Sequence, residues 1–194
     1  MPKEIEKESS DSFRRQYEEA LKALQQERHS EALELLNGCL ALLPRNPQAL
    51  YARAVTGISM GRYRKAACDL MKTIALDRAL LDAYKQLGFV QFMLGKEEAA
   101  LKTLAKGLEI DPRYTEIFCV QGDIYIDLGE LDKAREAYEK ALELEPDKPE
   151  PHSKMAMYHL ARGDMKGLKR EYELLKSLDP ALAEQIGTLY FETP

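Results

Sequence analysis

Proline recurs along this chain at one fixed interval. Pro44, Pro112, Pro146 and Pro180 lie on a grid of 34 residues, and Arg78 occupies the grid point that lacks a proline. A constant period of this length predicts an array of stacked supersecondary units, because one such unit alone cannot bury its apolar face.

Small residues recur within the five units that the grid defines: residues 13–46, 47–80, 81–114, 115–148 and 149–182. The eighth position of each unit is always alanine or glycine: Ala20, Ala54, Gly88, Gly122 and Ala156. The fifteenth position is glycine in four units: Gly61, Gly95, Gly129 and Gly163. This spacing predicts one helical hairpin per unit, since small residues let two helices approach and glycine accepts the left-handed backbone that ends the first helix. The proline grid predicts the end of the second helix, because proline cannot continue its hydrogen bonds.

The fourth unit has the signature residues of a known repeat family: Phe118, Gly122, Tyr125, Gly129, Ala134, Tyr138, Ala141 and Pro146. On these residues the chain resembles the tetratricopeptide repeat (TPR) family, and the resemblance covers residues 13–182. The first and fifth units depart from the pattern, because Glu27 replaces the turn glycine and Leu168 replaces the second alanine. The resemblance implies an all-α fold, a right-handed α-solenoid of five TPR-like helical hairpins with a C-terminal capping helix.

Both ends of the chain lie outside the five units. We expect residues 1–12 to be a disordered N-terminal tail and residues 183–194 to form the capping helix and a C-terminal tail. Leu182, Ile186 and Leu189 share one helical face, which would cover the last hairpin. Tyr190 and Phe191 fit either this cap or contact with a partner, and the sequence leaves both alternatives open.

In the TPR family the first helix of each hairpin lines a concave surface, and positions 2, 5, 9, 12 and 13 face a ligand. Carried over to this chain, these positions imply a partner-binding groove with twelve candidate residues: Tyr17, Leu21, Tyr51, Val55, Lys85, Phe89, Phe92, Met93, Glu116, Asp123, Asp127 and Met157. The first three units would form an apolar, aromatic wall, and the fourth would add acidic residues. Such a groove suits a peptide or helix that carries apolar side chains and a basic residue near its C-terminal half. The alternative is that position 12 packs against the second helix and belongs to the core.

One specialised TPR site, the clamp for the C-terminal carboxylate of heat-shock chaperones, requires lysine, asparagine and arginine at set positions. Here Tyr17 and Leu21 replace the first pair, Ala52 replaces the next asparagine, and Asp82 and Gln86 replace the last pair. Asp82 would repel a carboxylate, so we expect no binding of a chaperone C-terminus.

Composition narrows the classes of function further. The formal net charge of -5 disfavours nucleic acid as a partner, and no stretch of sequence is apolar enough to span a membrane. Three widely spaced cysteines, Cys39, Cys68 and Cys119, indicate free thiols in a reducing compartment, which favours the cytoplasm. Of these, Cys119 falls at groove position 5. His152 and His159 lie at packing positions of the fifth unit, so we expect no metal site there.

Charge is distributed unevenly along the array. The second unit is rich in arginine and lysine, including Arg53, Arg62, Arg64 and Lys65, whereas the fourth is rich in aspartate and glutamate. This asymmetry favours either two ordinary solvated faces or head-to-tail self-association.

The sequence predicts a protein that is not an enzyme, has no cofactor and no catalytic residues, and acts as an adaptor or scaffold for a protein or peptide partner. The alternative is a chaperone or assembly factor for a specific client, with self-association left open. The partner, the pathway and the source organism are not determined by the sequence.

Overall fold

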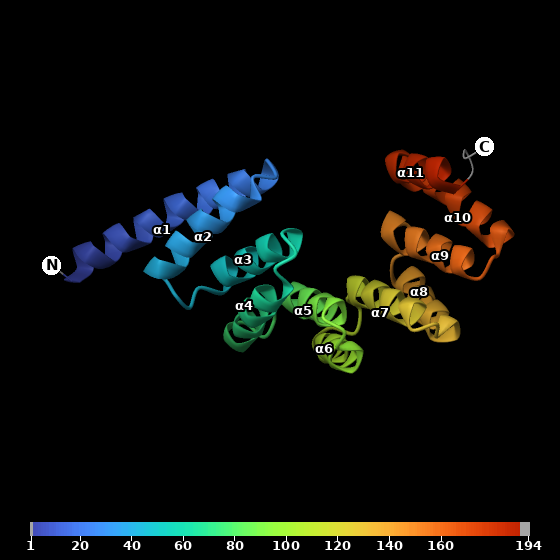
Figure 1. Ribbon diagram of the computed structural model, residues 1–194, viewed down its shortest axis with the longest axis horizontal. Helices are drawn as coiled ribbons and strands as arrows, with labels where there is room; N and C mark the ends of the chain where they lie inside the picture. Colours follow the sequence, from blue (N-terminus) through green and yellow to red (C-terminus); the bar gives the residue numbers. More distant parts are fainter. Residues whose placement is uncertain (1, 191–194) are drawn as a thin grey trace. The chain divides into compact units, whose positions relative to one another are not determined.

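The computed structural model describes residues 2–190 and the side chains of residues 10–188. The described part is all-α, with eleven helices and no strand. Figure 1 shows the helices following one another as hairpins. Their bounds are α1 (Pro2–Gln25), α2 (His29–Leu42), α3 (Pro47–Ser59), α4 (Tyr63–Leu76), α5 (Leu81–Met93), α6 (Glu97–Ile110), α7 (Thr115–Asp127), α8 (Leu131–Leu144), α9 (Pro149–Ala161), α10 (Met165–Leu178) and α11 (Pro180–Tyr190).

The helix bounds repeat with the period of the sequence. The second helices of the five hairpins begin 34 residues apart, at His29, Tyr63, Glu97, Leu131 and Met165. Each of them ends two residues before a grid position; α8, for example, ends at Leu144 and is followed by Pro146. The predicted division into five hairpins is therefore present in the structure.

The turn inside each hairpin has the same backbone conformation. Gly61, Gly95, Gly129 and Gly163 have φ angles of 69°, 67°, 73° and 70°. The residue after each glycine donates its backbone N–H to a carbonyl five residues earlier, as Arg62 does to Gly57 at 2.7 Å. This pattern is a Schellman motif, which satisfies carbonyls that the end of the first helix leaves unpaired.

Two of the small residues at the eighth position lie where a side chain would collide with the opposite helix. A Cβ added to Gly88 would meet Leu104 of α6 at 2.5 Å, and one added to Gly122 would overlap the ring of Tyr138 on α8. Close approach of the paired helices thus explains these glycines, as the sequence predicted.

The chain divides into two compact units, residues 1–106 and 107–194. We call these two halves unit 1 and unit 2, as distinct from the five 34-residue repeats, and describe each by itself. The largest core cluster of unit 1 joins α3, α4 and α5 through Ala54, Ala66, Leu70, Ala83, Leu87 and Val90. In unit 2, Tyr138 of α8 packs with Met155 and Tyr158 of α9.

The C-terminal helix covers the last hairpin. Ala183 and Ile186 of α11 are buried in one cluster with Leu168 and Leu175 of α10, so the predicted cap is present. It begins at Pro180 rather than at residue 183, because proline suits the first turn of a helix and Asp179 caps that turn by accepting from the N–H of Leu182 at 3.0 Å. The side chains of Leu189 and Tyr190, and the whole of Phe191, lie outside the described part.

Helix α1 begins at Pro2, so residues 2–12 are helical where the sequence analysis expected a disordered tail. Segment 3–8 consists mostly of glutamate and lysine, which have high helix propensity, and it continues the α1 helix without a proline or glycine.

Candidate protein-binding surfaces

The predicted groove residues of unit 1 lie on α1, α3 and α5, the first helices of three hairpins. On α1, Tyr17 is partly buried and stacks on Phe13, with ring centroids 5.7 Å apart. Burial raises the pKa of its hydroxyl above the ordinary value. Leu21, one turn further along α1, is 39% exposed.

On α3, Tyr51 and Val55 are both partly buried and lie one turn apart. Burial and the negative charge of Asp82 on α5 raise the pKa of Tyr51 to about 12, while a hydrogen bond with Gln86 acts in the opposite direction. The Tyr51 hydroxyl therefore remains protonated at neutral pH and lies beside α5. The sequence analysis placed Asp82 and Gln86 only as residues that disqualify a carboxylate clamp, and their contact with Tyr51 was missed.

On α5 the four predicted residues have different environments. The Nζ of Lys85 lies 2.8 Å from Oδ1 of Asp82, so the lysine charge is paired. Phe89 packs against the unit 1 core and meets the ring of Tyr63 edge-on at 6.5 Å, so part of this side chain stabilises the contact between α5 and α4. Phe92 is partly buried, whereas Met93 is 44% exposed.

In unit 2 the predicted acidic residues do not act alike. Asp123 of α7 accepts a hydrogen bond from the hydroxyl of Tyr138 on α8 at 2.8 Å and lies 2.6 Å from Nζ of Lys154 on α9. Burial also raises the pKa of the Tyr138 hydroxyl. Asp123 is thus a junction between three helices, with both carboxylate oxygens already bonded. Lys154 was not among the predicted site residues.

The other candidates on α7 and α9 are more accessible. Asp127 is exposed, and Met157 of α9 is 43% exposed. Glu116 is partly buried, and its carboxylate is 4.0 Å from Nζ of Lys148.

Cys119 is buried, with 1% of its surface exposed, although the sequence placed it at a ligand-facing position. Burial, followed by the charge of Glu150, raises the pKa of its thiol to about 12. A thiol in this environment stays protonated and is a poor nucleophile.

His152 has a structural position in unit 2. Its Nδ1 lies 2.8 Å from a carboxylate oxygen of buried Glu171 on α10, and its Nε2 lies 2.7 Å from the carbonyl oxygen of Pro146. Both ring nitrogens of His152 therefore have a hydrogen-bond partner within unit 2. Within residues 2–190, no group of three or more histidine, cysteine, aspartate or glutamate side chains is placed to hold a metal ion.

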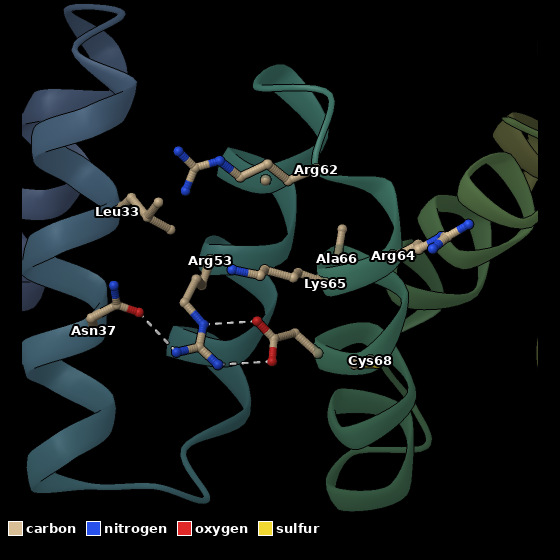
Figure 2. A pocket seen from close by; sticks show the side chains of 10 residues that line it. Leu33, Asn37, Arg53, Arg62, Arg64, Lys65, Ala66 and Cys68 are labelled. Carbon is tan, nitrogen blue, oxygen red and sulfur yellow. Dashed lines mark hydrogen bonds and ion pairs between the residues drawn. The ribbon is translucent and has the colours of Figure 1, made fainter. Parts of the chain in front are cut away.

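A cavity of about 440 Å³ lies between α2 and α4, with α3 behind it, and we call it the α2–α4 cavity. Arg53 of α3 donates to both carboxylate oxygens of Asp69 at 2.7 and 2.8 Å and to Asn37 of α2 at 2.9 Å. Figure 2 shows Arg62 and Lys65 extending toward α2 beside this arrangement. This cavity was not predicted from the sequence, although the excess of arginine and lysine in the second repeat was a signal for it.

Two family models match the chain: "Tetratricopeptide repeat" over residues 17–87 and "TPR repeat" over residues 122–162. Together these segments span more than half of the sequence, and they agree with the hairpin period described above. The chain is a tetratricopeptide repeat protein. The predicted fold class of a TPR α-solenoid is confirmed.

Solved structures of other TPR proteins share this fold. TTC0263, a thermophilic TPR protein from Thermus thermophilus, is 26% identical, with a TM-score of 0.81 over 91% of this chain and 97% of that chain. MamA from Desulfovibrio magneticus RS-1 is 20% identical, with a TM-score of 0.69 over 88% and 97% of the two chains. YrrB, described as a TPR protein with an unusual peptide-binding site, is 18% identical, with a TM-score of 0.58 over 89% and 90%. A comparison with curated proteins gave no significant match.

TPR proteins generally mediate interactions between proteins, and the fold is typically a non-catalytic scaffold. Among residues 2–190 of this TPR protein, no helix combines the length and the apolar character that crossing a membrane requires.

Proposed function

We propose that this TPR protein is an adaptor or scaffold that holds a segment of a partner protein against the first helices of its repeats. The observation that carries the proposal is that α1 and α5 leave Leu21 and Met93 outside the core, 39% and 44% exposed. Both lie at positions that face ligands in the family. Large apolar side chains at such positions are typical anchors for a partner.

The side chains around these anchors suggest the chemistry of the partner in unit 1. Tyr51 and Val55 of α3 and Phe92 of α5 add partly buried apolar surface, and the Tyr51 hydroxyl and Gln86 add polar groups. A peptide or helix with two or three apolar side chains fits this combination.

In unit 2 we propose fewer acidic contact residues than the sequence suggested. Asp123 is already bonded to Tyr138 and Lys154, so it contributes little to binding a basic residue. Asp127 and Glu150 are exposed, and we assign contact with a basic partner side chain to these two.

As part of this proposal, the protein has no catalytic activity and works in the cytoplasm. The structure forms no disulfide between Cys39, Cys68 and Cys119, and unpaired cysteines suit a reducing compartment. Once a partner is known, incubation with this protein should leave the partner's mass unchanged, which mass spectrometry would check.

The test is affinity capture with substitutions that place a charge on the proposed surface. We expect Leu21→Glu and Met93→Glu to lose the partner that the unmodified protein captures, because a charged side chain cannot enter an apolar contact without losing its hydration. Met71→Glu is the matched control, since Met71 is 51% exposed on α4, a second helix outside the proposed surface. All three variants should retain helical circular dichroism.

Equal capture by all three variants would contradict the proposal. The behaviour of a partner found in this way also distinguishes a scaffold from a chaperone. A scaffold forms a stable complex with a folded partner, whereas a chaperone suppresses aggregation of its client.

A further inference from the structure

The α2–α4 cavity contains positive charge that no described residue neutralises. Arg53 is paired with Asp69, a carboxylate whose side chain is only 8% exposed. Within the described residues, by contrast, the side chains of Arg62 and Lys65 form no ion pair or hydrogen bond. Both line the cavity, and in Figure 2 both extend from the start of α4 toward α2.

The start of α4 adds to this positive potential. The N-terminus of a helix carries a partial positive charge, which acidic residues usually offset. Acidic residues lie in the first turn of α2, α6 and α8, and Asp164 caps α10. Helix α4 has no acidic residue in its first turn, and its N-cap residue Arg62 makes no side-chain cap. Arg64 and Lys65 occupy that turn instead, and their positive charges are unfavourable at the N-terminus of the isolated helix.

The cavity is also large enough for a ligand bigger than a single small ion. Its volume of about 440 Å³ is within the range of ligand-binding pockets. Leu33 of α2, which is partly buried, gives it an apolar wall beside the charged groups. A single inorganic anion is too small to fill a cavity of this volume.

We propose that the α2–α4 cavity binds an acidic segment of a partner protein, with carboxylates at Arg62 and Lys65 and aliphatic side-chain carbons against Leu33. Arg53, held by Asp69 and Asn37, forms the fixed back of the site. This site involves the second helices and is separate from the surface proposed above. A nucleic acid is disfavoured because the described residues that line the cavity include no aromatic side chain for base stacking, and because the chain carries a net charge of -5.

The first experiment measures binding of a fluorescein-labelled octaglutamate peptide by fluorescence anisotropy, with octaglutamine as the uncharged probe. We expect octaglutamate to bind, octaglutamine not to bind, and the affinity to fall with added salt. The double variant Arg62→Gln and Lys65→Gln should bind about tenfold more weakly, because two partly exposed charge contacts are lost. Lys72→Gln is the matched control, since Lys72 is exposed on the same helix but does not line the cavity.

The second experiment locates the bound peptide. Cys68 lines the cavity and is exposed, whereas Cys39 and Cys119 are buried. Octaglutamate should therefore slow the reaction of Cys68 with iodoacetamide, a neutral reagent, in the unmodified protein and in Lys72→Gln. The protection should be lost in the double variant, which circular dichroism should show to be folded.

Three results would overturn the proposal. One is that octaglutamate binds in the wrong place: the double variant keeps the full affinity, or the bound peptide does not slow the alkylation of Cys68. Another is equally tight binding of a labelled thymidine decanucleotide, which would assign the cavity to nucleic acid. The third is self-association at low salt that the double variant abolishes, which sedimentation would detect and which would make a second copy of this chain the occupant.

Discussion

Glu27 has a φ angle of 56°, and it is the only non-glycine residue with a positive φ in the described part of the chain. The equivalent residue in each of the other four hairpins is glycine. A left-handed backbone costs a residue with a Cβ about 1–2 kcal/mol, and replacement by glycine relieves this at some cost in chain entropy. We expect Glu27→Gly to raise the free energy of unfolding by about 0.5–1 kcal/mol in urea denaturation.

Gly61→Ala is the reverse change and the control for Glu27→Gly. A Cβ added to Gly61 would meet no atom within 4 Å, so its effect reports the backbone alone. Because Gly61 has a φ angle of 69°, the change should lower the free energy of unfolding by about 1 kcal/mol. Loss of stability in both variants would show that Glu27 is not strained.

The three cysteines differ in reactivity because they differ in burial. Cys68 is exposed, whereas Cys39 and Cys119 are buried and burial raises the pKa of both thiols, that of Cys119 to about 12. At pH 8 a thiol reagent should modify one cysteine rapidly in the native protein and all three after denaturation. The two buried thiols need either unfolding or a pH near their raised pKa values. Rapid modification of Cys119 in the native protein would contradict its placement.

At the scale of helices, one buried pair joins α9 to α10. His152 and Glu171 are 8% and 4% exposed. Removing one member takes one partner from the other, although Glu171 keeps Arg170 at 3.3 Å and His152 keeps the Pro146 carbonyl. His152→Leu and Glu171→Leu should therefore each lower the free energy of unfolding by about 1–3 kcal/mol. In a double-mutant cycle the double variant should lose less than the sum of the two single losses.

The exposed pair Lys176 and Glu173 on α10 is the control for the buried pair. Lys176→Ala should change stability very little, because water solvates either charge when the other is removed. Additive losses at His152 and Glu171 would mean that these two side chains are not coupled.

Helix α11 stabilises the last hairpin by covering apolar side chains of α10. Ile186 is 7% exposed and packs in one cluster with Leu168 and Leu175, which are fully buried. Ile186→Ala should lower the free energy of unfolding by about 2–4 kcal/mol through lost burial and the cavity left behind. Gln185→Ala, at an exposed position of the same helix, should have almost no effect. Equal stability of the two variants would contradict the capping role of α11.

At the scale of the whole molecule, contacts divide the chain into residues 1–106 and 107–194. In repeat proteins stability is transmitted mainly between neighbouring repeats. Gly122→Val forces a side chain into the space of the Tyr138 ring and should raise amide hydrogen exchange in α7 to α11, while α1 to α4 keep their protection.

Gly88→Val is the corresponding change in unit 1, where Leu104 occupies the space that a side chain would need. It should raise exchange in α5 and the neighbouring α4 more than in α9 to α11. Uniform loss of protection in either variant would show that the array unfolds as a single cooperative unit.

The sequence alone determined where the turns and ends of the five hairpins lie, but not where α1 and α11 begin. The period of 34 residues, the turn glycines and the grid prolines are local signals, because a left-handed φ or a missing N–H acts on the backbone at its own position. The resemblance to the TPR family implied the candidate groove positions, and the exposure of Leu21, Met93 and Met157 in the structure agrees with a surface location. Whether these residues bind a partner stays a prediction.

Only the tertiary structure decided which charges are free. Asp123 had the sequence position of a groove residue, yet Tyr138 and Lys154 reach it from two other helices. Arg62 had no distinctive motif, yet helix packing leaves it without a partner among the described residues, beside a cavity formed by three helices. The physical reason is that a repeat fixes the backbone of each hairpin, whereas the partner of a long polar side chain depends on which neighbouring helices bring their own side chains within reach.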